Sequence, residues 1–299
     1  MSKKIIVFCA LFLICLNFFA WREVFGLICD SNLKVYFLDV GQGDANFIQT
    51  PQNHYILIDG GPDSLILEKL NKTLPFWNRG LDLVILTHPE KDHLTGILEI
   101  LKRYRVNNFL WTGVIKNDIQ NKELATLLEK IQQRKESLFF ASLIGPSQTK
   151  VLTIKAGDKI RAGDVLIDTL YPIEDMEGKE AKKTTNDSCL VLKLIFGKNS
   201  FLFTGDIGFA EEKNIINLKK DISAEVLKIA HHGSKYSTSE SFLENVKPEI
   251  AVIEVGKNKY GHPAPETLQR LKNFGIKKIF ITNRDGDIKI SSDGNQIYW

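Results

Sequence analysis

Hydrophobic and polar residues alternate in short runs along the part of the chain that follows residue 31. The runs 34–40, 45–50 and 55–60 are rich in β-branched and aromatic residues, and turns that contain Gly or Asn separate them. This pattern predicts three antiparallel strands. The next run, 81–88, is predominantly apolar and predicts a buried strand.

Helices are indicated where apolar residues recur at intervals of three and four. Leucine and isoleucine follow this spacing within 94–101 and again within 124–131, which predicts two amphipathic helices. Beyond them, strands and helices alternate. We expect three strands between 151 and 171, further strands at 189–196, 200–206, 226–232, 249–255 and 277–283, helices near 209–217 and 268–274, and a closing hairpin around Asp285 and Gly286.

The order of these elements predicts the fold class. Strands come first in a cluster and then alternate with helices, and this succession occurs twice. Because a sheet must bury its apolar faces against other layers, the order favours two mixed sheets packed face to face with helices outside, which is a four-layer αββα sandwich of the α/β class. We expect one domain over residues 32–299, with a lysine-rich, solvated loop at 177–187.

The first 31 residues form a separate segment. Lys3 and Lys4 precede a run at 5–20 in which Asn17 is the only polar residue, and Trp21 closes the run. A positive start, an apolar stretch and an aromatic residue at its end are typical of a signal anchor or a secretory signal peptide, and we favour the anchor. The lysines predict that the rest of the chain lies outside the cytoplasmic membrane, anchored or secreted.

Composition excludes several classes of protein. Of the 299 residues, 43% are hydrophobic and 25% are charged, which is typical of a folded protein and excludes disorder, collagen and a protein with many membrane spans. The net charge of +3 is too small to indicate nucleic-acid binding by itself. Four cysteines without a CxxC pair argue against a disulfide scaffold and a structural zinc knuckle.

The strongest chemical signal is the segment THPEKDHLTG at 87–96. His88 ends the predicted strand, Glu90 lies in the loop, and Asp92 and His93 begin the helix. A single histidine at a strand end is usually structural, but that explanation does not cover four metal-binding side chains within six residues. Histidine and carboxylate side chains together suit divalent transition metals, so the segment predicts a metal site.

Two later positions carry polar side chains at similar junctions. Asp206 follows an apolar strand in FLFTGD, and it is either a helix N-cap or a carboxylate that bridges two metals. His262 lies in the Gly-His-Pro turn of YGHPAPET, directly before a helix. His54, in contrast, lies in a hairpin turn and has no such neighbours.

A histidine pair leaves a buried strand in KIAHHGSKYSTS at 228–239. His231 and His232 enter a loop that contains Ser234, Lys235 and Ser237. The hydroxyl, ammonium and backbone N–H groups of such a loop can bind an anionic oxygen. A plain turn between a strand and a helix would explain the serines but not the two histidines.

These motifs together resemble those of the metallo-β-lactamase superfamily. The set consists of HxxxDH, TGD, HHGS and YGHP, preceded by FLDVGQGDA at 37–45 and LIDGG at 57–61. More narrowly, it is similar to the soluble domain of the ComEC-type DNA-uptake channel protein, from residue 33 to about residue 292. The resemblance implies the αββα sandwich, with the site at one edge between the two sheets.

The resemblance also implies roles for individual residues. Asp59 corresponds to an aspartate that holds the metal loop by hydrogen bonding, Asp44 in the Gly-Gln-Gly-Asp turn shapes the rim of the pocket and touches the site, and Asn186 belongs to an Asn-Ser element that supports it. The implied metal ligands are His88, Glu90, Asp92, His93, Asp206, one of His231 and His232, and His262.

Two features depart from the general pattern of the superfamily. Glu90 stands where the middle histidine of HxHxDH belongs, as is usual in ComEC-type sequences, and no histidine precedes the TGD aspartate. The first metal position is therefore poor in nitrogen ligands. A set rich in carboxylates favours harder ions, so manganese is a rival to zinc, magnesium is a further candidate, and either one or two ions are bound.

The implied chemistry is hydrolysis of phosphodiester bonds, with DNA as the substrate we favour. Asp92 would hold the attacking water as a base, while Lys235 and the two loop serines, Ser234 and Ser237, would receive a phosphate. Lys182 and Lys183 are more distant contacts of the same kind.

Two alternatives stay open from the sequence. The same metal site serves a hydrolase of a lactone, an ester, a thioester or a β-lactam, and the reduced ligand set also suits a catalytically silent domain that binds DNA or a partner. Tyr236 and Tyr260 flank the predicted site and could stack on the bases of a single strand. A separate DNA-uptake channel protein is a candidate partner, and the sequence does not indicate the oligomeric state.

Overall fold

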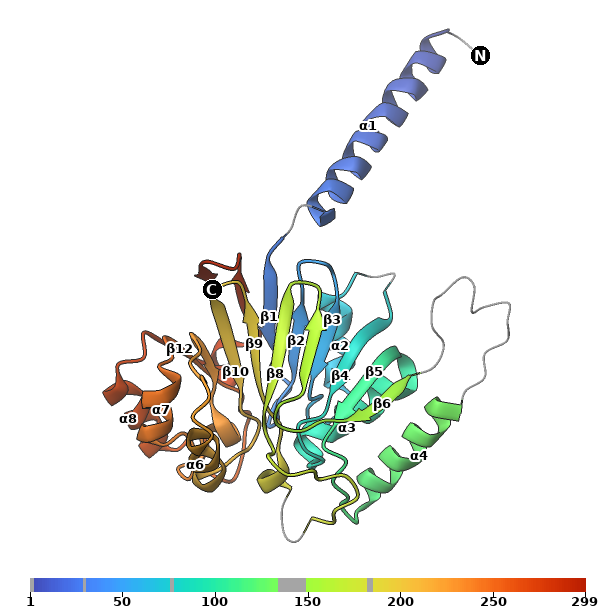
Figure 1. Ribbon diagram of the computed structural model, residues 1–299. Coiled ribbons are helices and arrows are strands. Elements are labelled where there is room, and N and C mark those ends of the chain that lie inside the picture. Colours follow the sequence, from blue (N-terminus) through green and yellow to red (C-terminus); the bar gives the residue numbers. More distant parts are fainter. Residues whose placement is uncertain (1–2, 29–30, 76–77, 134–148, 182–184) are drawn as a thin grey trace.

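The computed structural model describes residues 3–28, 31–75, 78–133, 149–181 and 185–299. Within these residues the strands form two sheets that face each other, of eight and seven strands, and helices cover both outer sides (Figure 1). The four-layer αββα sandwich that the sequence predicts is therefore confirmed.

The first sheet combines N-terminal strands with the last two strands of the chain. Its order is β15-β14-β1-β2-β3-β4-β5-β6, antiparallel from β15 to β3 and parallel from β3 to β6. The three antiparallel strands predicted at the start of the domain are β1 to β3. The bounds are β1 Leu33–Phe37, β2 Asn46–Gln49, β3 Tyr55–Ile58, β4 Gly80–Ile85, β5 Arg105–Trp111, β6 Lys150–Thr153, β14 Ile288–Ser292 and β15 Ile297–Tyr298.

The second sheet has the order β13-β12-β11-β10-β9-β8-β7. It is antiparallel from β7 to β10 and parallel from β10 to β13. The strand predicted at 226–232 ends earlier than expected, because the chain turns sharply at the histidine pair. The bounds are β7 Lys159–Ala162, β8 Val165–Tyr171, β9 Val191–Phe196, β10 Asn199–Phe203, β11 Val226–Lys228, β12 Ile250–Ile253 and β13 Lys278–Ile281.

Helices cover the outer face of each sheet. The predicted helices near 94–101, 124–131, 209–217 and 268–274 are present as α3, α4, α6 and α8, whereas α2 and α7 were not predicted. The bounds are α1 Lys3–Ile28, α2 Leu65–Thr73, α3 Lys91–Arg103, α4 Ile119–Gln133, α6 Phe209–Asn217, α7 Glu240–Val246, α8 Pro265–Phe274 and α9 Thr282–Asp285, with short 3₁₀ turns η1 Asn186–Ser188 and η2 Ala230–Gly233.

The closing hairpin predicted around Asp285 and Gly286 is wrong. The short helix α9 occupies the position of the expected turn, and β14 then leaves the second sheet and pairs with β1 of the first. The Asp-Gly pair does separate two strands, but a local turn signal does not specify which sheet the next strand joins.

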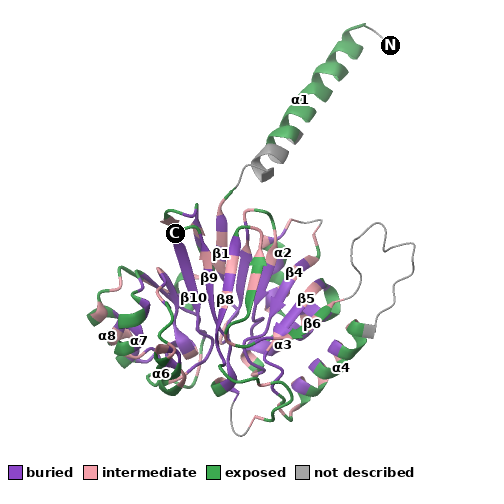
Figure 2. Ribbon diagram, in the orientation of Figure 1, coloured by how far each residue is buried: buried purple, intermediate pink, exposed green. Residues whose placement is uncertain are grey.

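Three apolar clusters hold the four layers together. One lies between the two sheets, the second between the first sheet and the helices α2 to α4, and the third between the second sheet and the helices α6 to α8. Figure 2 shows most strands buried and the outer faces of the helices exposed, while the edge strands β6 and β7 are partly exposed. All five residues of β10 are buried, as expected for a strand covered on both faces.

Close packing between α3 and the loop after β3 allows a first prediction. A Cβ atom at Gly96 would lie 1.8 Å from the carbonyl oxygen of Gly60. Because a Gly→Ala change inside a helix ordinarily stabilises by about 1 kcal/mol, any loss of stability must come from this contact. We expect Gly96→Ala to lower the free energy of unfolding by about 1–3 kcal/mol in urea titrations. The neighbouring Thr95→Ala serves as control, and equal unfolding midpoints for the two variants would contradict the prediction.

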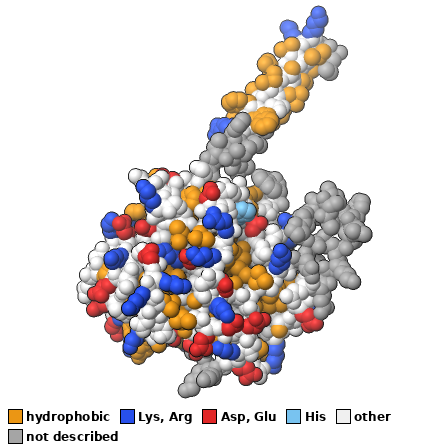
Figure 3. Space-filling view, in the orientation of Figure 1, with side chains coloured by type: hydrophobic (Ala, Val, Ile, Leu, Met, Phe, Trp, Pro, Cys, Tyr) orange, Lys and Arg blue, Asp and Glu red, His pale blue; other side chains and the backbone are white. Residues whose placement is uncertain are grey.

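The N-terminal helix α1 extends away from the two sheets (Figure 1). Its described side chains are exposed, and hydrophobic ones cover much of the face shown in Figure 3. In the part of the chain that the structure describes, no helix combines the length and the apolar character needed to cross a membrane. The signal anchor or signal peptide, and the position outside the cytoplasmic membrane, stay predictions.

Candidate metal centre

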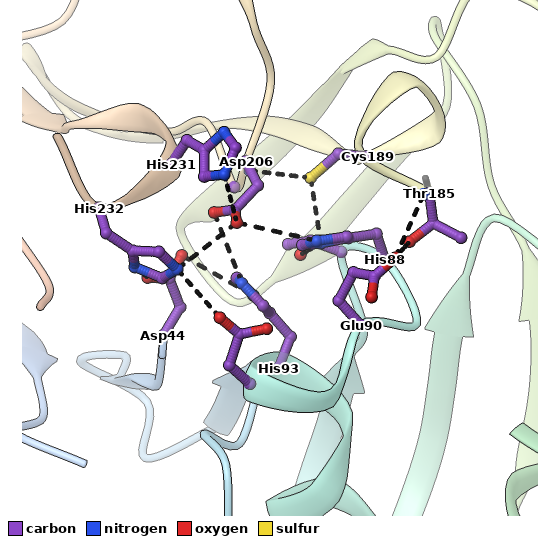
Figure 4. A network of polar contacts seen from close by, with 12 residues as sticks. Asp44, His88, Glu90, His93, Thr185, Cys189, Asp206, His231 and His232 are labelled. Carbon is purple, nitrogen blue, oxygen red and sulfur yellow. Dashed lines mark hydrogen bonds and ion pairs between the residues drawn. The ribbon is translucent and has the colours of Figure 1, made fainter. Parts of the chain in front are cut away.

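The candidate ligands come from loops at one end of the two sheets (Figure 4). His88 follows β4, His93 lies in the first turn of α3, Asp206 follows β10, and His232 follows β11. In each sheet these strands belong to the parallel part. Since loops after parallel strands meet at the carboxyl edge of a sheet, residues distant in sequence converge there.

A sharp turn directs the histidine pair. His231 and His232 both have left-handed backbone conformations, with φ of 52° and 54°. Such conformations are unfavourable for residues other than glycine and persist where the surroundings impose them, often at functional sites. The turn buries His232 completely, whereas the side chain of His231 stays 36% exposed at the mouth of the site.

Asp206 is the common neighbour of four histidines. Its Oδ1 atom lies 3.5 Å from Nε2 of His93, and its Oδ2 atom lies 3.5 Å from Nε2 of His232. The Oδ2 atom also lies 4.0 Å from Nε2 of His88 and 4.0 Å from Nε2 of His231. The four imidazoles therefore present the same ring atom to a single carboxylate.

The other ring nitrogen of each buried histidine has its own partner. Nδ1 of His93 lies 2.8 Å from Asp59 Oδ2, and Nδ1 of His232 lies 2.9 Å from the carbonyl oxygen of Glu254. The Thr87 hydroxyl donates to Asp59, so Nδ1 of His88, 3.1 Å from that hydroxyl oxygen, must be the donor. In its neutral form each of the three rings keeps its proton on Nδ1 and offers a lone pair on Nε2 to a metal ion.

The buried polar atoms fit a divalent metal ion. Among the described residues, Nε2 of His88, His93 and His232 and Oδ1 of Asp206 are buried and lack a hydrogen-bond partner. Buried polar atoms are almost always paired, so this shared deficit indicates a missing ligand. Three imidazole nitrogens and a carboxylate are donors that zinc and manganese accept.

Asp92 and Asp44 approach His232 from opposite sides of its ring. Oδ2 of Asp92 lies 3.3 Å from Nε2, on the side where an ion would bind, whereas Oδ1 of Asp44 lies 3.3 Å from Nδ1. Asp44, His93, Asp206 and His232 do offer atoms within 4.8 Å of one another. Since the contacts of Asp44 are with Nδ1 atoms, we place Asp44 behind the imidazoles and Asp92 among the ligands.

The charges of the site are set by burial and by mutual contact. Burial and the neighbouring His93 lower the pKa of His88 to about 3, so its ring is neutral. Burial disfavours the cationic forms of His93 and His232, but Asp206 and other carboxylates outweigh it and raise both pKa values. Burial alone would raise the pKa of Asp206, but the same histidines hold it well below its usual range. Asp206 is therefore an anion at neutral pH.

The position of Asp59 leads to a second prediction. Its carboxylate accepts hydrogen bonds from the Thr87 backbone N–H and hydroxyl and from Nδ1 of His93. An asparagine has one acceptor oxygen, so Asp59→Asn leaves a donor facing an NH₂ group. We expect the affinity for zinc or manganese to fall about 10–100-fold in equilibrium dialysis. The exposed Asp63→Asn should bind as the unaltered chain does, and an Asp59→Asn variant with full affinity would contradict the role.

Glu90 is not brought into the converging set. One oxygen accepts a hydrogen bond from the Thr185 hydroxyl at 2.8 Å, and the other is paired with the ammonium of Lys116. Asn186 begins the turn η1, where its carbonyl accepts the N–H of Cys189. The Cys189 thiol lies 3.5 Å from Nδ1 of His88 and therefore lines the same side of the site.

Two serines predicted to bind substrate serve the loop instead. Ser234 and Ser237 are buried, and the Ser237 hydroxyl donates to the carbonyl of Ala230 at 2.8 Å. Lys235 is exposed, with its ammonium 5.1 Å from the ring of Tyr236. The Ser234 oxygen accepts the N–H of Tyr236 at 3.3 Å, so both serines bond within the turn, and of the three predicted phosphate contacts in this loop only Lys235 is accessible.

His262 lies at the mouth rather than at the centre. Its ring is 5.8 Å from that of His231, and its Nδ1 atom is buried without a hydrogen-bond partner, so it is a candidate ligand at the edge of the set. Lys182 and Lys183, predicted as distant phosphate contacts, lie outside the described residues.

Lys228 and Glu254 are parts of the site that the sequence reading missed. Both are buried at the ends of strands, and Glu254 accepts the N–H of Ala45 at 2.9 Å. Burial and the nearby Asp44 raise the pKa of Glu254 to about 8. A signal was present, because each residue places a charge within an otherwise apolar strand, in VLKIA and IAVIEV.

A separate cleft lies apart from this centre. It has a volume of about 670 Å³ and lies between β5, β6 and β7, where Leu110, Ile154 and Ile160 contribute to its lining. None of the residues around Asp206 lines it, so we assign it no part in the chemistry.

Comparison with known proteins agrees with this geometry. The profile of the Metallo-beta-lactamase superfamily matches residues 38–256. ComE operon protein 3 of Bacillus subtilis is 30% identical over 279 residues, which cover 87% of this chain and 33% of that protein. Recombination protein 2 of Haemophilus influenzae is 30% identical over 244 residues, which cover 79% of this chain and 26% of that protein. The chain thus spans a third or less of the length of these relatives.

A solved structure supports the fold. The metallo-beta-lactamase fold protein YhfI from Bacillus subtilis matches with a TM-score of 0.57 at 13% identity, over 88% of this chain and 100% of that one. At this identity the likeness concerns the fold alone. The resemblance inferred from the motifs is confirmed by the sequence matches, and the chain belongs to the metallo-β-lactamase superfamily of metal-dependent hydrolases.

Proposed function

We propose that the chain is a metal-dependent phosphodiesterase that hydrolyses DNA outside the cytoplasmic membrane. The observation that carries the proposal is the set of buried Nε2 atoms of His88, His93 and His232 around Asp206. Relatives named for competence and recombination, such as Competence protein ComA of Neisseria gonorrhoeae, support DNA as the substrate.

Residues around the centre can accept a proton from water and bind the phosphate of the substrate. A bound divalent ion supplies Lewis acidity, which activates water and polarises a phosphoryl oxygen. Asp92, whose side chain is 32% exposed, reaches both His232 and solvent, so its carboxylate can accept the proton of the attacking water. The exposed ammonium of Lys235 can pair with a phosphate at the mouth.

A row of rings leads from the surface to the centre and favours a single-stranded substrate. Tyr260 is 67% exposed and stacks on His262 with ring centroids 5.9 Å apart. His262 in turn contacts His231, and His231 contacts His232. An exposed aromatic ring at the mouth can stack on an unpaired base, which is the usual way in which proteins hold single strands.

The stacking role predicts a change that depends on the substrate. Tyr260→Ala should weaken binding of a single-stranded oligonucleotide by about 1–3 kcal/mol, because one base loses its stacking partner. It should leave the hydrolysis of bis-p-nitrophenyl phosphate unchanged, since that substrate has no base. Tyr298→Ala, another exposed tyrosine, is the control. Equal losses on both substrates would contradict the role.

The proposed activity is tested with a series of substrates. Single-stranded DNA, bis-p-nitrophenyl phosphate and nitrocefin are each supplied with manganese or zinc. We expect turnover of the two phosphodiesters, and turnover of nitrocefin alone would contradict the proposal in favour of a hydrolase of small β-lactams, esters or lactones.

A catalytically silent DNA-binding domain is the second candidate function. Its support is the engagement of Glu90 by Lys116 and Thr185, which leaves the first metal position poor in ligands. This function predicts DNA binding that is independent of added metal and no turnover of any substrate in the series.

We also propose that a separate DNA-uptake channel protein delivers the substrate. The support is that the chain is similar to relatives named for competence, such as Competence protein ComA of Neisseria gonorrhoeae. Co-purification of a membrane channel protein with the tagged full chain would agree with this, and its absence after crosslinking would argue against it.

A further inference from the structure

A lysine is buried inside the candidate metal centre. Lys228 is 1% exposed and lies at the end of β11, directly before the turn that carries the histidine pair. Lysine is almost never buried completely unless its charge is paired. Neither an apolar strand nor the ligand set requires a lysine here, so its presence needs an explanation.

The ammonium of Lys228 joins three segments that carry the site. It is paired with the carboxylate of Asp44 in the loop after β1, and it donates to the carbonyl oxygen of Gly205 at 3.0 Å. It also lies 3.9 Å from Oδ1 of Asp206. The lysine stem belongs to the strand that leads to His232, so one side chain connects the loops of Asp44, Asp206 and His232.

These contacts reach the metal ligands on the side that faces away from the ion, at the Nδ1 atoms of the histidines and at the backbone before Asp206. Asp44, held by Lys228, lies 3.3 Å from Nδ1 of His232 and 3.8 Å from Nδ1 of His93. Gly205, which accepts the second bond, directly precedes Asp206. Burial disfavours the ammonium, but Asp44, Asp206 and Glu254 outweigh it and raise the pKa of Lys228 above its usual value. The ammonium of Lys228 is therefore charged at neutral pH.

We propose that Lys228 is a positioning residue of the metal centre. Its ammonium fixes Asp44 against the backs of two imidazoles and fixes the backbone that precedes Asp206, so that the ligands hold their geometry before an ion binds. The inference rests on the metal centre of the proposed function, but it does not depend on which substrate is hydrolysed.

The test replaces the cation by an apolar side chain of similar length. Lys228→Met is titrated with Co²⁺, whose visible absorption reports the coordination geometry, and its affinity for the ion is measured by competition with a chelator. We expect the affinity to fall at least about 10-fold, as for other groups that orient metal ligands, together with a changed absorption spectrum. Lys193→Met is the matched control, since Lys193 is also a buried strand lysine paired with an aspartate, Asp221.

A double variant separates positioning from stability. Lys228→Met leaves Asp44 charged and buried, so loss of stability alone could weaken binding. Asp44→Asn combined with Lys228→Met removes both charges, and we expect it to recover thermal stability without recovering cobalt affinity or the spectrum.

Each outcome decides the proposal. Either variant, if folded, with the affinity and spectrum of the unaltered chain would overturn it. If both variants are unfolded while Lys193→Met is folded, Lys228 is required for folding and the positioning role is rejected. Absence of phosphodiesterase activity in the unaltered chain would contradict the proposed function but would leave these cobalt measurements unaffected.

Discussion

His88→Ala combined with Asp206→Ala is expected to reduce phosphodiester hydrolysis by more than about 100-fold, since even groups that only orient metal ligands typically contribute 10–100-fold. Asp206 contacts four imidazoles, and His88 supplies one of the three buried Nε2 atoms. Their removal leaves too few donors for tight binding of an ion. Lys235 and Tyr260 are untouched, so binding of single-stranded DNA should persist in a filter or anisotropy assay.

The chain offers a matched control for this variant. His54 and Asp82 form another histidine–aspartate pair, with Nδ1 and Oδ2 4.0 Å apart, on the surface away from the centre. His54→Ala combined with Asp82→Ala should retain hydrolysis within a few-fold. Unchanged hydrolysis in the His88 and Asp206 variant would remove the metal mechanism.

Addition of zinc or manganese to metal-free protein is expected to raise the melting temperature by about 5–10 °C, and a chelator should reverse the rise. An ion at 100 times its dissociation constant stabilises the folded state by about 2.7 kcal/mol. In a domain of this size each kcal/mol of stabilisation raises the melting temperature by about 2–4 °C. The buried Nε2 atoms of His88, His93 and His232 provide the site. The measurement is differential scanning fluorimetry, with His93→Ala as the control that should not respond.

The rise should be larger at pH 8 than at pH 6. Burial disfavours the cationic forms of His93 and His232, but Asp206 and other carboxylates outweigh it and raise both pKa values, so the metal-free rings hold protons at pH 6. An ion must displace these protons, which weakens its binding as the pH falls. A rise that is independent of pH would argue that other groups bind the ion.

Much of the fold could be predicted because the pattern is local. Apolar runs such as 81–88 and spacings such as that of 94–101 specify strands and helices through periodicity alone, and their order specified the layers. The same spacing is present in α2, whose buried residues Ile66 and Leu70 are four positions apart, so this helix was also predictable. The pairing of β14 with β1 depends on packing between distant segments, which periodicity does not contain.

The sequence motifs indicated which segments of the chain carry the site. The structure gathers His88, His93, Asp206 and His232 because each follows a strand of a parallel region, and a strand end can be recognised from sequence. It does not gather Glu90, whose partner Lys116 comes from a loop that no motif marks.

The hydrogen-bond and ion-pair partners of the site residues could not be predicted from the motifs. The choice between Nδ1 and Nε2 depends on Asp59, Thr87 and the Glu254 carbonyl, each supplied by a different segment. Lys228 was visible as a charge in an apolar strand, but its contact with Asp44 bridges the two sheets and has no local signature.

Diffraction from crystals of freshly purified protein, recorded at the zinc and manganese absorption edges, tests the central claim most directly. The account predicts an anomalous peak within bonding distance of Nε2 of His93 and His232 and of a carboxylate oxygen of Asp206. An absent peak after soaking in either metal, or a peak elsewhere in the chain, would contradict it.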